Sequence, residues 1–238
     1  MKKTLLTLVA ASALSVSAQA EQFWADNSVS VLYGSDYEFN VDEDTTTLTL
    51  EHVSGHSWGD LFYFVDRHNG ANYKETYGEF SPNFTLTKME GLVTSVKLAY
   101  TYEFGSFQTA TGFATGFDNH LVGVAADLKV PGLDFASVTL YRALNEGSDS
   151  DDNQITVVAG YSNGNLIIDG FMDYAFGSEN DGTEDSMNLT PQITYNLAPM
   201  LGLKNKLKVG VEYSYWTNQF GFDGQDQNAI SLLLKAHL

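Results

Sequence analysis

Carboxylate, lysine and aromatic side chains recur at every second position in several segments of this 238-residue chain. Alternate side chains of a strand lie on one face, so each such segment would present them on a common wall. Carboxylates accept hydrogen bonds from hydroxyls and amines, and aromatic faces stack on flat apolar groups. The wall could therefore bind a small polar solute with a flat ring, or its charges could simply pair across a polar interior for stability. Its proposed pore-lining or substrate-binding members are Glu51, Asp60, Phe62, Phe64, Asp66, Glu75, Tyr77, Glu79, Lys97, Glu103, Asp127, Asp169, Phe171, Asp173, Lys208, Glu212 and Trp216.

The opposite face of the same segments is apolar and has a direction. In LKVGVEYSYW at 207–216, aliphatic residues and then tyrosines alternate with polar residues, and 96–104 and 166–176 repeat the pattern. A strand that crosses hydrocarbon and ends at a membrane interface shows this order. If the apolar face of these strands contacts lipid and the polar face contacts water, the strands must close into a barrel around a wet interior.

Period-2 runs and turn residues indicate about twelve strands, an even number as bacterial single-chain barrels have. Brief connections alternate with mostly longer, acidic ones, among them 35–44, 105–119, 143–154, 177–186 and 217–227; HNGAN at 68–72 is a short exception. We therefore expect an all-β, transmembrane antiparallel up-and-down β-barrel in the bacterial outer membrane, with both termini periplasmic. Pro82 and Pro191 fall inside strands and predict bulges or strand ends there. The strands are expected near residues 28–34, 45–53, 59–68, 72–86, 92–104, 119–130, 134–142, 154–162, 165–176, 187–197, 206–216 and 228–238.

Residues 1–20 carry Lys2, Lys3, a short apolar run and Ala18-Gln19-Ala20, which is typical of a secretory signal peptide. A transmembrane helix is the alternative, but the run is short for ~20 apolar residues. The barrel would occupy 21–238. Without cysteine, an exported chain has no disulfide framework. Loss of Lys2 and Lys3 takes the net charge from −18 to about −20, which argues against a nucleic-acid partner.

Acidic clusters at Asp42–Asp44 and at Asp149, Asp151 and Asp152 invite comparison with calcium loops. Neither cluster supplies the glycine and the twelfth-position glutamate of such a loop. Solvated loops are the simpler interpretation, although metal-bridged contact with lipopolysaccharide and attraction of cations to the mouth stay open. We expect no cofactor and no metal site.

The five histidines form no zinc motif on a helix. His52 and His56 are four apart but would straddle a strand end and a glycine-containing turn. A barrel hydrolase would need a lipid-facing or rim serine beside a histidine and a carboxylate or amide. His120 with Ser106 or Asp118 is imaginable, yet nothing in the sequence separates these residues from a loop end, and we expect no enzyme activity.

Residues 75–104 read ETYGEFSPNFTLTKMEGLVTSVKLAYTYEF, in which Glu79, Pro82, Phe84 and Met89 stand in the frame of an E-x-x-P-R-x-S-x-x-x-L strand followed by an amphipathic strand. This stretch resembles the nucleoside-specific channel Tsx family, which includes OmpK-like porins. Residues 58–69 and 166–182 resemble further segments of that family, so the likeness covers most of the chain in order.

The resemblance implies a twelve-stranded outer-membrane channel with a narrow lumen that passes nucleosides, and a further role as a phage or colicin receptor. Two departures matter: Asn83 stands where the family has arginine, and Leu238 where outer-membrane barrels usually end in phenylalanine. Tyr63 and Phe84 should face lipid by strand alternation. By position, the residues on family motifs are Trp58, Asp60, Phe62, Tyr63, Asp66, Glu79 and Phe84.

Two other readings stay open. A non-transporting barrel with a plugged lumen could act through its acidic extracellular loops as a receptor or adhesin. A soluble periplasmic β-sandwich could also produce amphipathic strands.

Overall fold

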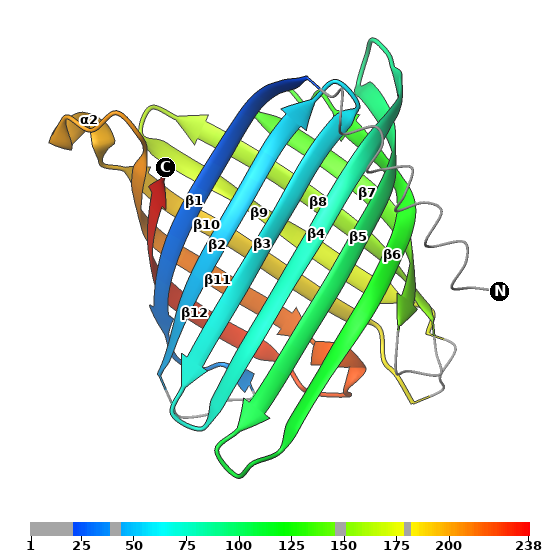
Figure 1. Cartoon of the computed structure of the whole chain (residues 1–238), viewed down its shortest axis with the longest axis vertical. Helices are drawn as coiled ribbons and strands as arrows, with labels where there is room; N and C mark the ends of the chain where they lie inside the picture. The colour runs from blue at the N-terminus through cyan, green and yellow to red at the C-terminus, as the bar shows by residue number, and fades with distance from the viewer. Residues whose placement is uncertain (1–20, 39–43, 146–150, 179–181) are drawn as a thin grey trace.

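Twelve antiparallel strands close into a barrel in the computed structural model, which describes residues 21–38, 44–145, 151–178 and 182–238 (Figure 1). Each strand pairs with its sequence neighbours, and β1 pairs with β12 to complete the ring. The fold class expected from the sequence is confirmed. The strands are β1 (Gln22–Gly34), β2 (Thr45–His56), β3 (Gly59–Gly70), β4 (Tyr73–Lys88), β5 (Val93–Thr109), β6 (Ala114–Leu128), β7 (Phe135–Asn145), β8 (Asp152–Asn163), β9 (Leu166–Phe176), β10 (Ser186–Asn196), β11 (Leu207–Thr217) and β12 (Gln227–His237).

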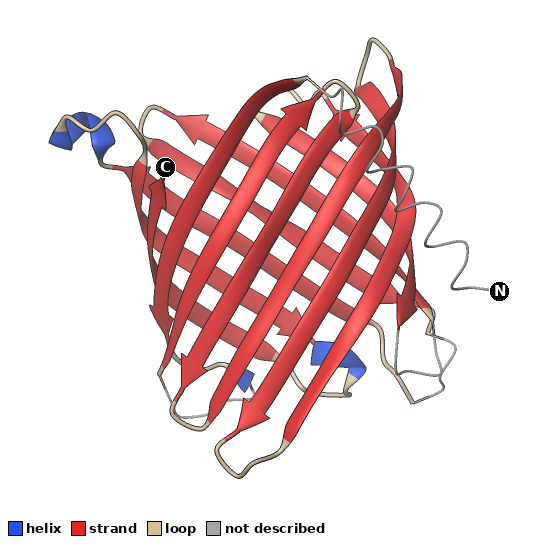
Figure 2. Cartoon of the chain, viewed as in Figure 1, coloured by secondary structure: helices blue, strands red, loops and turns tan. Residues whose placement is uncertain are grey.

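The connections of the barrel gather at two ends. The turn end, at the top of Figure 1, holds the start of β1, the end of β12 and the connections at 57–58, 89–92, 129–134, 164–165 and 197–206. The loop end holds the remaining connections. Two short helices mark opposite ends in Figure 2, with α2 (Ala198–Leu201) at the turn end and η2 (Gln219–Gly221) at the loop end.

The long loop expected at 105–119 is wrong. β5 and β6 continue pairing through Phe107 and Thr115, which leaves a short turn at 110–113. Gly105 is a packing position within β5: a Cβ on this residue would lie 2.3 Å from the Phe117 ring, which covers it. A glycine inside a strand often marks such a close approach.

The bulges or strand ends expected at Pro82 and Pro191 do not form; each proline lies inside a continuous strand and interrupts the ladder on one side only. Pro82 pairs with Leu61 of β3, but the β4–β5 register passes from Phe80 to Asn83 without it. Pro191 pairs with Gly170 of β9, while the β10–β11 register passes from Leu189 to Gln192. The missing N–H of each proline is therefore turned to the side where pairing lapses.

The outward face of the barrel is apolar. In β12, Ile230, Leu232 and Leu234 are 61%, 65% and 49% exposed, whereas Ser231, Leu233 and Lys235 between them are buried. Val31, Leu48, Leu50, Leu98, Val124, Leu140 and Ile193 continue this surface around the ring. An apolar surface of this extent on a closed barrel is the surface that contacts lipid in transmembrane barrels.

The buried core lies inside the ring rather than between layers. Ala99, Leu121, Ala125, Tyr141 and Ala143 form one apolar cluster on the inward faces of β5, β6 and β7. The sequence did not predict that part of the inward surface, in this sector, is apolar. The charged side chains of Lys97 and Glu103 on β5 and of Asp127 on β6 share these inward faces with the cluster.

No helix in the described part of the chain is long and apolar enough to cross a membrane. The proposed signal peptide at 1–20 lies outside the described residues.

Candidate functional site

An aromatic strip runs along the inward faces of β3, β4 and β6. The ring centroids of Phe62 and Phe64 are 5.6 Å apart, those of Phe64 and Tyr77 are 5.6 Å apart, and those of Tyr77 and Phe117 are 6.2 Å apart. These spacings are those of interacting aromatic pairs. Phe117 was missed from the sequence because it was assigned to a loop; the alternation of Phe117, Asn119 and Leu121 is the signal that could have found it.

Two glutamates stand beside this strip, directly opposite each other. Glu79 of β4 pairs in register with Glu103 of β5. The Tyr77 hydroxyl donates to Glu79 at 2.7 Å, and the Asn119 amide donates to Glu103 at 3.3 Å. Like charges directly across a strand pair repel, so two ionised carboxylates at this position would destabilise each other.

Lysines occupy the turn-end half of the interior. The Lys97 ammonium on β5 lies 2.5 Å from Asp60 of β3 and 2.6 Å from Asp127 of β6. Asp60 also accepts a hydrogen bond of 2.7 Å from the Asn83 amide. Asn83, the departure from the arginine of the Tsx pattern, is therefore part of this ionic cluster.

Two more lysines each reach across one intervening strand. Lys208 of β11 lies 3.3 Å from Asp169 of β9, and Lys235 of β12 lies 2.8 Å from Glu51 of β2. Glu51 also accepts a bond from Ser28 on the strand between. Both lysine side chains are buried, at 4% and 7% exposed, so these pairs are shielded from bulk water.

The remaining carboxylates of the wall lie in the middle and loop-end part of the interior, and their contacts are with neutral groups. Asp66 accepts from Thr49 at 2.5 Å, Asp173 from Thr156 at 2.5 Å and Glu212 from Gln192 at 2.8 Å. Within the described ranges, no lysine or arginine forms a salt bridge with any of this set: Asp66, Glu75, Glu79, Glu103, Asp173 and Glu212. Near the turns, three lysines therefore pair with four carboxylates, and towards the loop end the interior carries carboxyl groups without a paired cation.

The last two predicted aromatic residues do not join the strip. Phe171 lies between Asp169 and Asp173 on the inward face of β9, on another part of the ring. Trp216 donates its indole N–H to the Ser186 hydroxyl at 2.8 Å and packs on Phe220, 4.9 Å away. Trp216 thus belongs to the loop-end rim.

Tyr37, which follows β1, folds into the barrel at the loop end. Its hydroxyl lies 2.6 Å from the hydroxyl of Ser231, an inward residue of β12, and its ring is 6.4 Å from that of His68. Burial raises the pKa of the Tyr37 phenol, so the phenol remains neutral at physiological pH. The sequence placed Tyr37 in an outer loop and gave no sign that it turns inward.

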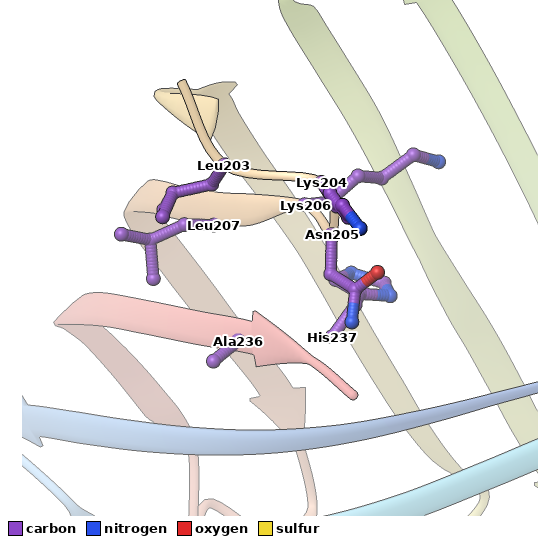
Figure 3. A pocket seen from close by; sticks show the side chains of 7 residues that line it. All are labelled: Leu203, Lys204, Asn205, Lys206, Leu207, Ala236 and His237. Carbon is purple, nitrogen blue, oxygen red and sulfur yellow. The ribbon is translucent and has the colours of Figure 1, made fainter. Parts of the chain in front are cut away.

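Two open pockets lie at the turn end. One of about 370 Å³ is lined by Trp24, Asp60, Lys97 and Asp127, among others. The second, of about 310 Å³, lies between the 203–207 connection and the end of β12; Leu203, Leu207 and Ala236 form one side and Lys204, Asn205 and His237 the other (Figure 3). The first pocket opens beside the ionic cluster of the interior, whereas the second shares no residue with the predicted wall.

His52, His56 and His120 make contacts that the sequence did not predict. His120 contacts Tyr100, whose hydroxyl lies 2.8 Å from its Nδ1, and stacks on Tyr102, so the combination with Ser106 does not form. β2 extends through His56, which places His52, Ser54 and His56 on one outward face rather than across a turn. In the part of the chain that the structure covers, no three His, Asp, Glu or Cys residues gather as a metal site. Asp42, Glu43 and Asp149 lie outside it.

A closed antiparallel barrel with an apolar exterior and a polar interior defines a porin-like β-barrel. A family model described as "Domain of unknown function (DUF5020)" matches residues 18–233, and the chain belongs to that family. No curated protein matches the sequence.

Similar solved structures include porins. The NanC porin is 12% identical with a TM-score of 0.55, over 89% of this chain and 100% of that chain. The KdgM porin is 12% identical with a TM-score of 0.48, over 88% and 98%. The translocator domain of the autotransporter NalP from Neisseria meningitidis is 9% identical with a TM-score of 0.43, over 90% and 86%. At these identities the likeness concerns the fold alone. A specific relation to the Tsx family is not among the findings.

Proposed function

We propose that the protein is an outer-membrane channel for passive diffusion of small polar solutes that carry a flat ring, nucleosides among them. The aromatic strip of Phe62, Phe64, Tyr77 and Phe117 carries the proposal. It offers successive stacking surfaces beside hydrogen-bond acceptors, which is what a sugar joined to a planar base requires.

The dimensions support a selective passage. A barrel of twelve strands is narrower than the 16- to 18-stranded porins that leave a wide aqueous channel. The apolar cluster on β5–β7 and Tyr37 at the loop end narrow it further. A solute would move along the strip and exchange one ring contact for the next, so that each binding step stays weak enough to allow release.

The same proposal gives the orientation of the barrel in the outer membrane. The acidic loop end would face the exterior and the turn end, with both termini, the periplasm. Aromatic residues near both ends of the outer face, such as Tyr63, Phe80, Tyr213 and Tyr215, fit the two interfacial belts of a spanning barrel. Protease added to intact cells should cleave the 143–154 or 177–186 loop and spare a tag at the C-terminus.

The channel is tested by planar-bilayer recording of the purified chain. Adenosine or thymidine should reduce the ionic current in a concentration-dependent way, and ribose alone should do so much more weakly, because only the base can stack. Phe62→Ala combined with Phe64→Ala should weaken the nucleoside effect about tenfold, since base stacking on an aromatic ring contributes roughly 1–3 kcal/mol.

Phe80→Ala is the matched control. Phe80 lies on the neighbouring strand of the same sector but is 44% exposed on the outer face, where it stacks on Tyr63. It should leave the nucleoside response unchanged. A conductance that no nucleoside alters would exclude the substrate class, and the absence of any conductance would exclude the channel.

The receptor role implied by the Tsx resemblance concerns the outer loops, and much of their acidic sequence lies outside the described residues. Removal of residues 146–150 and 179–181 should abolish binding of a phage or colicin if the loops are recognised. Loss of solute flux with retained binding would favour the receptor role over the channel.

A further inference from the structure

A hydrogen-bonded line of three side chains crosses the outward face of β1 and β2 near the turn end. Asn27 of β1 pairs in register with His52 of β2, and its Oδ1 lies 2.8 Å from Nδ1 of the imidazole. The other ring nitrogen of His52, Nε2, lies 2.9 Å from Oγ of Ser54, two residues along the same face. An acceptor, an imidazole and a hydroxyl in this order form the arrangement by which enzymes activate a serine.

The contacts define where each proton lies. With Asn27 Oδ1 towards the ring, Nδ1 of His52 must carry the proton and donate it to the amide oxygen. Nε2 is then an acceptor and receives the Ser54 O–H. Ser54 Oγ is also 2.8 Å from Nε2 of His56, so His56 donates to the serine oxygen. The serine hydroxyl therefore points to a base, with an N–H donor at its other side.

The position on the outer surface selects a substrate class. Leu48 and Leu50, 42% and 51% exposed, precede His52 and Ser54 on the outward face of β2. The strand thus passes from an apolar surface to polar groups as it nears the turn end. In a spanning barrel this boundary lies at the depth where phospholipid ester carbonyls separate acyl chains from headgroups.

Aromatic rings surround the line on this face. Tyr63 stacks on His52 at 4.7 Å, and Trp58 stacks on His56 at 4.9 Å. Tyr63, a strand residue, holds the His52 imidazole against the sheet, whereas the ring on His56 belongs to the turn at 57–58. An aromatic belt alone accounts for the rings, but it does not require a serine between two imidazoles or an amide oxygen aligned with Nδ1.

We propose that Ser54, His52 and Asn27 form a serine hydrolase site for carboxylic esters of membrane lipids. Ser54 Oγ attacks the acyl carbonyl carbon while its proton passes to His52 Nε2. The C–O bond to the alcohol then breaks, and that proton moves to the leaving oxygen. Water then attacks the acyl-serine and gives a proton to His52 Nε2. The Oγ–acyl bond breaks, the proton passes from His52 to Ser54 Oγ, and a free fatty acid is released.

His56 controls access and stabilises charge in this scheme. Ser54 is 0% exposed, so an ester carbonyl reaches Oγ only after an imidazole moves aside. His56 is the last residue of β2 and adjoins the turn at 57–58, which makes it the mobile partner. Once displaced from Oγ, its Nε2–H lies within reach of the oxygen that becomes negative in the tetrahedral intermediate.

Covalent labelling tests the nucleophile directly. The full chain, refolded in phosphatidylethanolamine and phosphatidylglycerol vesicles, is treated with a fluorophosphonate probe, and the modified peptide is mapped by mass spectrometry. Ser54 should be labelled and Ser54→Ala should not. Ser30→Ala, which removes a buried serine from the inward face, should retain the label. Failure to label Ser54 in a barrel that shows heat-modifiable gel migration overturns the proposal, as does labelling of another serine instead.

Hydrolysis distinguishes catalysis from mere reactivity. The wild type should release fatty acid from the vesicles, and Ser54→Ala and His52→Gln should each reduce the rate by about 100-fold or more. Asn27 is a positioning residue, so Asn27→Asp should retain most activity and Asn27→Leu should lose it with a shifted pH profile. Equal rates in all variants overturn the proposal. Conductance of Ser54→Ala should match the wild type, because the site lies outside the lumen; the channel and the hydrolase therefore stand or fall separately.

Discussion

At the residue scale, Glu79 and Glu103 face each other across β4 and β5, and repulsion between their carboxylates lowers the stability of the barrel. Replacement Glu103→Gln removes one of two opposed charges and keeps the oxygen that accepts from Asn119. We expect the free energy of unfolding at pH 8 to rise by about 0.5 kcal/mol, within the range for cross-strand pairs. Urea titration in lipid vesicles measures it.

Glu51→Gln is the comparison variant, for which we expect the free energy of unfolding to change in the opposite direction. Glu51 faces a lysine rather than a carboxylate, at 2.8 Å from Lys235, so loss of its charge should lower the free energy of unfolding. Two substitutions of the same chemistry should thus shift stability in opposite directions. If both destabilise equally, charge repulsion is not what distinguishes the Glu79–Glu103 position.

Tyr37 lies inside the barrel at the loop end. Its hydroxyl bond to Ser231 holds the ring over the interior, and burial keeps the phenol neutral by raising its pKa. If the barrel is a channel, Tyr37→Ala should increase single-channel conductance at neutral pH. Tyr33→Ala, which removes a ring 49% exposed on the outer face, should leave the conductance unchanged. If Tyr33→Ala increased the conductance and Tyr37→Ala did not, Tyr37 would not be the residue that constricts the channel.

At the scale of elements, the interior lysines act as staples between strands that are not neighbours. Lys97 of β5 holds Asp60 across β4 and also Asp127 of adjacent β6. Lys208 and Lys235 each bridge one strand in the same way. Backbone ladders fix only neighbouring strands, so these ion pairs add cross-ring constraint at the turn end, where five connections, the start of β1 and the end of β12 gather.

Lys97→Met should therefore cost more stability than loss of a surface charge. It leaves two partly buried carboxylates close together without a cation, and we expect a loss of about 2 kcal/mol, typical for hydrogen bonds to charged groups. The temperature of the heat-modifiable gel shift should fall accordingly. Lys74→Met, at an exposed position of β4, should not change it. If Lys97→Met and Lys74→Met lower the temperature of the gel shift equally, the ion pairs of Lys97 do not contribute to stability.

At the scale of the whole molecule, the interior has a large excess of carboxylates. Ten acidic residues of the proposed wall face three lysines, Lys97, Lys208 and Lys235, all of which are paired. A water-filled passage lined in this way attracts cations and repels anions. This asymmetry adds to the acidic character of the whole chain, whose net charge is −18.

Reversal potentials in a KCl gradient should therefore show a preference for K⁺ over Cl⁻. The preference should decline as salt rises from 0.1 M to 1 M, because the screening length falls from about 10 Å to about 3 Å. Replacing Glu79 and Asp173 together with glutamine should reduce it further. Anion preference, or no preference at low salt, would contradict this view of the interior.

The sequence by itself determined that the chain forms an all-β barrel, how many strands it has and which face of most strands is apolar. These features are local: a period of two assigns each side chain to a face, and turn residues separate the strands. The same locality explains the failures. The loop expected at 105–119 is wrong because Gly105 packs on Phe117, Gly116 packs on the backbone of Gly105, and both contacts form only across the strand pair.

The tertiary structure decided which side chains meet. The register between strands and the closure of β1 on β12 place Lys235 opposite Glu51, set Glu79 against Glu103, and align Asn27 with His52 and Ser54. Partners such as Lys235 and Glu51 are far apart in sequence, and a shift of one residue in any register would turn a whole strand face away from them. Composition and periodicity hold no record of register, because many registers satisfy the same alternation.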